Sequence, residues 1–99
     1  RETFLNDQYL NQLARRIKRS GEVVRLEGHT DDQGSEKYNR WLGMQRAYQI
    51  RSILIKKGVR RKQIIHESKG EVAPIVTNNS DENRHRNRRV EVSIISNGS

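Results

Sequence analysis

Hydrophobic side chains recur along this chain with two periods, one typical of helices and one typical of strands. In the first twenty positions they lie at spacings of i, i+3, i+4 and i+7, as Leu10, Leu13, Ala14 and Ile17. This spacing places them on one face of a helix. We predict that helix over residues 7–19, with Asn6 or Asp7 as its cap and Ser20-Gly21 as its stop.

A longer periodic segment predicts a second helix over residues 36–57, the longest in the chain. Gly58 follows it at the position where a glycine commonly ends a helix. The apolar residues expected on its buried side are Tyr38, Trp41, Leu42, Ala47, Ile50, Ile53 and Leu54.

Three shorter segments are typical of strands. Residues 22–27 are rich in β-branched side chains and are followed by a glycine, and residues 63–68 also contain adjacent β-branched residues. Residues 88–95 alternate polar and apolar side chains with period two, which predicts one buried face.

The connecting segments are predicted to carry little regular structure. We expect residues 69–74 to be irregular, and residues 78–86 to form at most a short helical turn after Ser80. The order of elements predicts an α+β fold, in the form of an α/β sandwich. In it a mixed sheet is covered on one face by both helices.

Length and composition predict one domain over residues 1–99, with a core from about 5 to 95 and a flexible tail over residues 96–99. Hydrophobic residues make up 31% of the 99 positions, which predicts a thin core of two layers. No apolar run is long enough to span a bilayer, so we expect any membrane association to come from parts outside this chain. The absence of cysteine excludes disulfides, thiolate metal sites and a cysteine nucleophile.

The chain carries a net charge of +8, with 20 basic and 12 acidic residues. Most of the excess lies in the second half of the chain. Such a charge favours a polyanionic neighbour, such as nucleic acid, an anionic lipid surface or an anionic wall polymer. Charge alone does not choose among these, and a merely solvated basic face explains it equally well.

The loop after the first predicted strand carries the best candidate chemistry. It contains Thr30 and Asp31 at the carboxyl end of a strand, where open α/β sheets usually bind ligands. Asn39 and Arg46 are seven residues apart on the following helix, so they share a face about 10 Å apart. Gly43 lies between them, which predicts accessible backbone there.

A carboxylate, a guanidinium and an amide placed in this way suit a small zwitterion. Asp31 would accept a hydrogen bond from an ammonium group, Arg46 would donate to a carboxylate, and Asn39 can do either. Two alternatives stay open: Asp31 and Arg46 pair with each other, or Thr30 and Asp31 only satisfy loop amides or cap the following helix.

Several of these residues belong to a wider pattern that resembles the OmpA-like peptidoglycan-binding domain. The resemblance covers roughly residues 10–95 and has both a GHTD and an NRRV element in register. Its motif residues here are Gly28-His29-Thr30-Asp31, Gly34, Tyr38-Asn39, Leu42, Arg46-Ala47, Gly70-Glu71, Pro74, Asn78, Arg84 and Asn87-Arg88-Arg89-Val90.

The resemblance implies a β-α-β-α-β fold and noncovalent binding to the cell wall through the meso-diaminopimelate of the peptidoglycan stem peptide. It implies that Asp31 takes the ammonium group of that residue and that Arg46 takes its carboxylate. The implied neighbours in the pocket are Asn39, Arg88, Thr30 and Leu42. Adjacent strand residues point to opposite faces, so one of Arg88 and Arg89 is expected to face the site and the other solvent or an acidic partner, and Arg88 is favoured for the site.

The same resemblance implies a place in the cell. Its family includes tails of outer-membrane porins, peptidoglycan-associated lipoproteins and wall anchors of flagellar motors. We therefore expect a soluble domain in the periplasm of a Gram-negative cell envelope, anchoring a parent protein to the wall. The parent and the oligomeric state are not specified by these residues.

The chain departs from the family pattern at a few positions. Gly43 stands where the family usually has serine, Ser68 stands where it has glycine, and Lys69 stands where it has an aromatic residue. These changes predict a more polar second edge of the pocket. The family's first strand normally precedes the first helix, and only residues 1–4 remain for it here, so that strand is missing or supplied from elsewhere.

Other function classes have weaker support. His29 with Asp31 and Asp32 invites a metal or hydrolase reading, but the three histidines lack ligand spacing and no nucleophile motif accompanies them. We therefore expect no enzyme, no metal and no cofactor, and a packed or hydrogen-bonded His29. A nucleic-acid module fits the charge, but aromatic residues are few and no RRM, KH or zinc-finger pattern is present, so no nucleic-acid partner is expected. A family member that binds only a protein partner is a further alternative.

Overall fold

The computed structural model describes residues 6–95. Residues 1–4, which precede the first helix where the family has its first strand, and the expected tail over residues 96–99 lie outside the described residues. Within them, no helix is long and apolar enough to cross a membrane.

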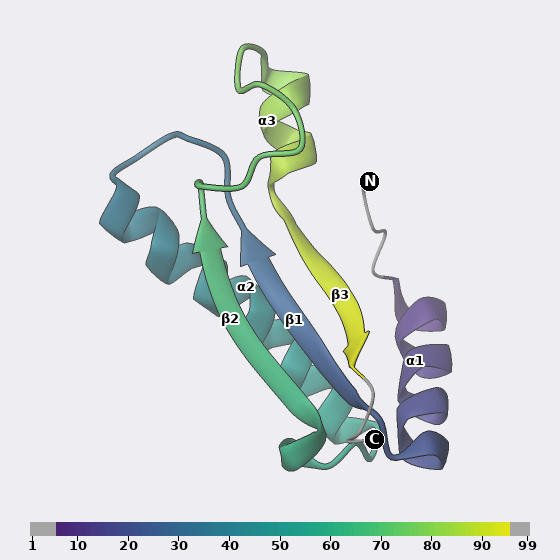
Figure 1. Cartoon of the computed structure of the whole chain (residues 1–99). Helices are drawn as coiled ribbons and strands as arrows, with labels where there is room; N and C mark the ends of the chain where they lie inside the picture. Colours follow the sequence, from purple (N-terminus) through teal and green to yellow (C-terminus); the bar gives the residue numbers. More distant parts are fainter. Residues whose placement is uncertain (1–5, 96–99) are drawn as a thin grey trace.

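A three-stranded mixed sheet forms the centre of the fold (Figure 1). Strand β1, Val23–His29, pairs in parallel with β2, Ile64–Gly70, and antiparallel with β3, Arg89–Ile95, so that the order is β2-β1-β3. Because β1 lies in the middle, the loop that leaves its carboxyl end emerges between the two edge strands. The site is built around that loop.

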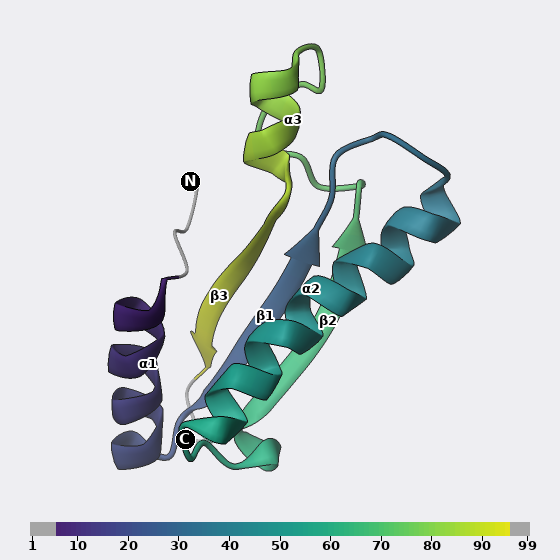
Figure 2. The same cartoon turned by 180° about the vertical axis from the view of Figure 1, so that it is seen from behind.

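Two long helices supply the second layer, as predicted. Helix α1, Asp7–Ser20, is capped by the Asn6 side chain, which accepts from the Tyr9 N–H at 2.8 Å. Helix α2, Glu36–Lys56, is capped in the same way by Ser35, which accepts from the Tyr38 N–H at 3.0 Å. Figure 2 shows α2 lying across β1 and β2 along most of its length.

The core lies between α2, α1 and one face of the sheet. It consists of Leu10, Leu13, Ala14, Ile17, Val24, Leu26, Ala47, Leu54, Val59, Ile64 and Val90. The opposite face of the sheet carries ion pairs, among them Arg25 with Glu67 at 3.0 Å. This division into an apolar and a charged face follows from the period-two alternation of the strands.

Two glycines bring α2 unusually close to β1. A Cβ atom added to Gly28 would lie only 1.7 Å from the carbonyl oxygen of Gly43, so the two backbones are in direct contact. The expectation that Gly43 leaves accessible backbone was therefore wrong, because that backbone packs against Gly28. The contact seats α2 so that Asn39 and Arg46, one turn to either side of Gly43, reach the end of β1.

The buried face of α2 is the predicted one in its C-terminal half, where Ala47 and Leu54 are buried and Ile50 and Ile53 pack against the core, but it differs in the N-terminal half. Its buried residues are Asn39, Gly43, Ala47 and Leu54, whereas Tyr38 and Trp41 are each more than half exposed. Small side chains lie on the inner face because the close approach of helix and strand leaves no room for rings. The aromatic residues point to solvent instead.

Strand ends also differ from the prediction. β1 continues to His29 and β2 continues through Lys69 and Gly70, which were predicted to be irregular. The parallel ladder extends the two strands together, across a register shift after Gly28. The Thr30 N–H still donates to the Gly70 carbonyl at 2.8 Å, so the loop starts from a fixed position.

Two short helical elements join the strands. A 3₁₀ helix, η1, Arg61–Gln63, precedes β2. Helix α3, Asp81–Asn87, is longer than the single turn predicted there. Ser80 caps α3 by accepting from the Asn83 N–H at 3.1 Å, and two acidic residues occupy its first turn, which favours the helix electrostatically.

Candidate functional site

The predicted site residues gather at the end of the sheet where β1 stops, α2 begins and α3 leads into β3 (Figure 1). Thr30 and Asp31 lie in the loop after β1 and are both buried. The Thr30 hydroxyl donates to the Asp31 carbonyl at 2.9 Å, and the Gln33 N–H donates to Asp31 Oδ1 at 2.9 Å. The alternative that these residues satisfy loop groups is thus realised for one carboxylate oxygen of Asp31.

The second carboxylate oxygen of Asp31 faces Arg88. Arg88, which lies between α3 and β3, donates from its guanidinium Nη1 to Asp31 Oδ2. The Arg88 side chain is 35% exposed, whereas that of Asp31 is 8% exposed. The carboxylate is therefore buried, and the guanidinium that pairs with it is partly open to solvent.

Arg89 lies on the other side of the sheet. Its side chain is buried and pairs with Glu91, and it also donates to the carbonyls of Asn87 at 3.0 Å and Ala73 at 2.9 Å. These contacts use the hydrogen-bond donors of the Arg89 guanidinium and fix the N-terminal end of β3. Of the two adjacent arginines, Arg88 is the one that contacts Asp31.

Asn39 holds the loop and the second edge of the site together. Its amide nitrogen donates to the Asp31 carbonyl at 3.2 Å and to Glu71 Oε1 at 2.8 Å. Its amide oxygen is buried without a hydrogen-bond partner in the described structure. Such a buried acceptor is costly unless a donor satisfies it. Glu71 was absent from the predicted set, although its Gly70-Glu71 pair belongs to the motif.

Arg46 lies half-buried under the same loop. Its Nη1 donates to the His29 carbonyl at 3.0 Å. Among the described residues it makes no ion pair with Asp31, so the predicted alternative of a direct Asp31–Arg46 pair is not what the structure shows. Leu42 is partly buried one turn before Arg46, on the same side of α2.

The site is electrically balanced, with carboxylates at Asp31 and Glu71 and guanidinium groups at Arg46 and Arg88. Burial raises the pKa of Asp31, but the Gln33 N–H, Arg88 and Arg46 together outweigh it, so the pKa lies below its usual value. Burial and the nearby Arg88 lower the pKa of Arg46, and Asp31 opposes them. Asp31 is therefore ionised at neutral pH, as an ammonium-binding group must be.

His29 is buried in the last position of β1. Its Nε2 lies 3.9 Å from Glu27 Oε1 and 3.8 Å from Glu91 Oε1, and neither ring nitrogen has a hydrogen-bond partner in the described structure. Glu27, His29 and Glu91 bring three potential metal ligands within 4.8 Å of one another. Arg89 and Lys69 already neutralise the two carboxylates, so the cluster needs no cation to balance it. The expectation of a packed or hydrogen-bonded His29 is met by packing, since the side chain is buried.

We expect His29 to make the domain less stable in mild acid. Burial, followed by the positive charge of Arg89, lowers its pKa from 6.5 to about 4. Between these values the unfolded chain binds the proton and the folded chain does not, so stability falls as pH falls through this window. The loss reaches about 3 kcal/mol at pH 4. Urea unfolding of wild type and His29→Gln from pH 7 to pH 4 measures it, and an equally steep decline in the variant would refute the assignment.

A model described as the OmpA family matches residues 6–88 of the chain. The chain belongs to the OmpA family. The matched segment of this OmpA-family domain contains every predicted site residue, from Thr30 to Arg88. Membership of the family confirms the prediction that the domain is not an enzyme.

Two curated relatives show the level of similarity. The OmpA-family domain is 39% identical over 79 residues to the peptidoglycan-associated lipoprotein of Pseudomonas aeruginosa, covering 80% of this chain and 47% of that protein. It is 36% identical over 88 residues to the peptidoglycan-binding protein ArfA of Mycobacterium bovis, covering 88% of this chain and 27% of that protein. The chain thus spans half or less of the length of these relatives.

Two solved structures have the same architecture. The peptidoglycan-associated lipoprotein from Burkholderia pseudomallei superposes with a TM-score of 0.85 at 30% identity, covering 91% of this chain and 80% of that one. The periplasmic domain of Helicobacter pylori MotB gives a TM-score of 0.78 at 31% identity, covering 92% and 62%. These likenesses confirm the predicted OmpA-like α+β fold.

Proposed function

We propose that this domain binds peptidoglycan without covalent bonds, through the meso-diaminopimelate of the stem peptide, and so anchors a parent envelope protein to the wall in the periplasm. Relatives named for their binding to or association with peptidoglycan support the class of ligand. The resemblance to a periplasmic domain supports the compartment. The observation that carries the proposal is the cluster of Asp31, Arg88, Arg46 and Asn39 at one end of the sheet.

The free end of meso-diaminopimelate bears an ammonium and a carboxylate on one carbon, and the site offers a partner for each. Asp31, with Glu71 nearby across Asn39, forms the acidic side. Arg46 and Arg88 form the basic side, and a guanidinium can donate two parallel hydrogen bonds to a carboxylate. The buried oxygen of Asn39 is an unused acceptor for the ammonium group.

Arg88 is expected to change partners when the ligand binds. In the free domain it holds Asp31 Oδ2, the oxygen that the ammonium would need. Its side chain is partly exposed, so it can turn toward the ligand carboxylate at little cost. The Asp31–Arg88 pair thus keeps the carboxylate charged and oriented until the zwitterion replaces it.

The domain should sediment with purified sacculi of the diaminopimelate type. We expect this retention to persist at moderate salt, since short charge-assisted hydrogen bonds in a half-buried site are screened less than surface charge. Duplex DNA serves as the comparison ligand, because a merely basic surface binds it with a steep dependence on salt. Retention on DNA and not on sacculi would overturn the proposal and favour the nucleic-acid alternative.

A further inference from the structure

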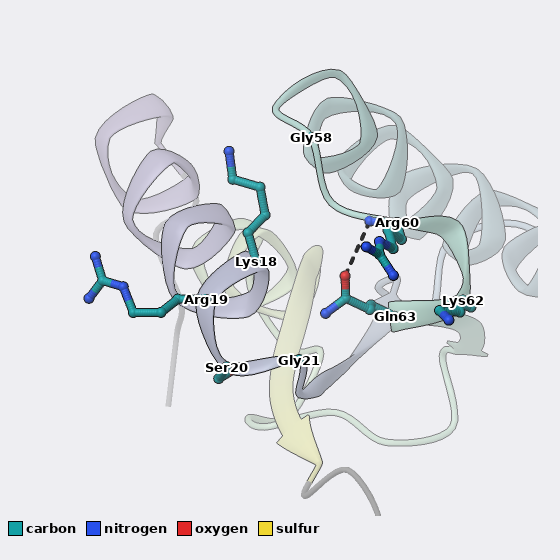
Figure 3. A pocket seen from close by; sticks show the side chains of 8 residues that line it. All are labelled: Lys18, Arg19, Ser20, Gly21, Gly58, Arg60, Lys62 and Gln63. Carbon is teal, nitrogen blue, oxygen red and sulfur yellow. Dashed lines mark hydrogen bonds between the residues drawn. The ribbon is translucent and has the colours of Figure 1, made fainter.

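A second feature of the molecule lies at the opposite end of β1 from the site just described. A hollow of about 520 Å³ opens between the C-terminal end of α1 and the segment that connects α2 with β2 (Figure 3). The residues that line it are Lys18, Arg19, Ser20, Gly21, Gly58, Arg60, Lys62 and Gln63. We call it the basic hollow. Its volume falls within the roughly 300–1,000 Å³ typical of small-molecule sites.

The walls of the basic hollow are tied together by one buried side chain. The Gln63 amide nitrogen donates to the carbonyls of Ile17 at 3.0 Å and Glu22 at 3.1 Å, and its oxygen accepts from the Arg60 N–H at 3.4 Å. Figure 3 shows Gln63 between the two walls with its bond to Arg60. The hollow is therefore a fixed feature of the fold rather than a gap between mobile ends.

The charge of the hollow has a single sign. Four of its eight lining residues are lysine or arginine and none is acidic. The connecting segment is itself strongly basic, with five lysines and arginines and no carboxylate over residues 56–62. The nearby carboxylates of Asp7 and Glu22 are already paired, with Lys57 and Arg16. None of the four lining cations forms an ion pair with a carboxylate in the described part of the chain.

Helix dipoles explain only part of this charge. Lys18 and Arg19 lie in the last turn of α1, where cations are favoured, and Lys18 Nζ donates to the Lys57 carbonyl at 2.9 Å. In Figure 3 the Arg19 side chain points away from the hollow, whereas Lys18 extends toward Gly58. Arg60 immediately precedes a single 3₁₀ turn and Lys62 lies within it, so neither stabilises an α-helix terminus. Their charge is a cost to the fold unless an anion offsets it.

We propose that the basic hollow binds a phosphate-bearing organic anion. A phosphate ester presents several oxygens, which suits one guanidinium fork and two ammonium groups, from Arg60, Lys18 and Lys62. The volume admits the ester together with the organic group that carries it. The proposal is independent of peptidoglycan binding, because the two sites lie at opposite ends of a seven-residue strand, about 20 Å apart.

Two matched double variants test this proposal. Arg60→Gln with Lys62→Gln removes two charges that line the hollow, and Lys56→Gln with Arg61→Gln removes two exposed charges from the same segment that do not. Titration with pyrophosphate at constant ionic strength should show wild-type binding that the first pair weakens at least about tenfold and the second pair less than threefold. Pyrophosphate should also raise the melting temperature of wild type, and the first pair should lose that rise while remaining folded.

A second experiment distinguishes a phosphate carried by a lipid from a phosphate carried by a soluble molecule. Cosedimentation with phosphatidylcholine vesicles containing phosphatidylglycerol, repeated with glycerol 3-phosphate as competitor, distinguishes a lipid headgroup from a soluble ester. Vesicle binding that depends on Arg60 and Lys62 supports a lipid-borne ligand, and pyrophosphate binding without vesicle binding supports a soluble one. Equal effects of the two double variants, or no wild-type binding to either probe, would overturn the proposal.

Discussion

Replacing Asp31 by asparagine is expected to weaken binding of a diaminopimelate stem peptide by roughly ten- to a hundredfold. The substitution keeps the shape of the side chain and an oxygen that can still accept from the Gln33 N–H. It removes the negative charge opposite Arg88, which the ligand ammonium is proposed to use. A charge-assisted hydrogen bond contributes about 1.5–3 kcal/mol, which corresponds to that loss of affinity. Isothermal titration with the soluble peptide measures it.

The neighbouring residue provides a matched control. Asp32 carries the same charge one position later, but it is exposed and contacts Arg84 at 3.5 Å outside the proposed pocket. We expect Asp32→Asn to change affinity less than twofold. Since Asp31 is buried, Asp31→Asn should also cost about 1–2 kcal/mol of stability, so both variants are compared well below their melting temperatures. Equal affinities for the two variants would remove Asp31 from the binding site.

Substitutions of Arg46 test how the carboxylate of the zwitterion is recognised. Arg46→Lys retains a positive charge but loses the planar fork that can hold both carboxylate oxygens. The remaining affinity should be lower than that of wild type and higher than that of Arg46→Leu. If leucine and arginine at this position bind equally, the carboxylate is held elsewhere.

The largest expected effect on stability comes from Gly28→Ala. Its new Cβ would lie 1.7 Å from the Gly43 carbonyl oxygen, a backbone atom that cannot turn away. The alanine can be accommodated only if α2 moves off β1, which breaks the packing of Ala47 and Leu54 as well. We expect a loss of at least about 3 kcal/mol in the free energy of unfolding, at the upper end of overpacking costs. Urea denaturation measures it.

A milder version of the same clash tests the geometry separately. A Cβ at Gly43 would lie 2.4 Å from Ser68 Oγ and 2.7 Å from the Gly28 carbonyl oxygen. Gly43→Ala should therefore destabilise less than Gly28→Ala, and adding Ser68→Gly should recover part of the loss by removing the nearer atom. A Gly28→Ala variant as stable as wild type would show that helix and strand do not touch here.

The contact between Gly43 and Ser68 also explains two departures from the family pattern. The family usually has serine at the first position and glycine at the second, and this chain has the reverse. The structure places the two positions against each other. The side chain of Ser68 on β2 therefore fills the space that a serine at position 43 on α2 would fill. Sequence alone showed both changes but not that they compensate.

Local signals predicted most of the regular structure. Asn6 and Gly21 mark the two ends of α1 through hydrogen bonds that involve only neighbouring residues, and the structure has them there. The extension of β1 to His29 was missed because it depends on pairing with β2, a long-range contact that no local pattern contains. Trp41 was misplaced for a similar reason, since the identity of the buried face of α2 depends on the glycine contact.

The candidate site could be predicted by residue type but not by partner. Asp31 and Arg88 are 57 positions apart, and only the closing of β3 against β1 brings them together. The sequence instead left Arg46 open as an alternative partner of Asp31, because the two residue types carry opposite charges. In the structure Arg46 donates to the backbone carbonyl of His29. A pattern of side chains along the sequence does not predict a hydrogen bond to a backbone group.

The central claim is that the site recognises the ammonium and carboxylate at the free end of meso-diaminopimelate. Titration of the wild-type domain with two stem peptides that differ only at the third residue tests it most directly. The lysine-type peptide keeps the side-chain ammonium but lacks the extra carboxylate, so Arg46 and Arg88 would gain no ligand carboxylate to bind. We predict affinity at least about tenfold higher for the diaminopimelate peptide. Equal affinity for the two peptides would contradict the zwitterion mechanism.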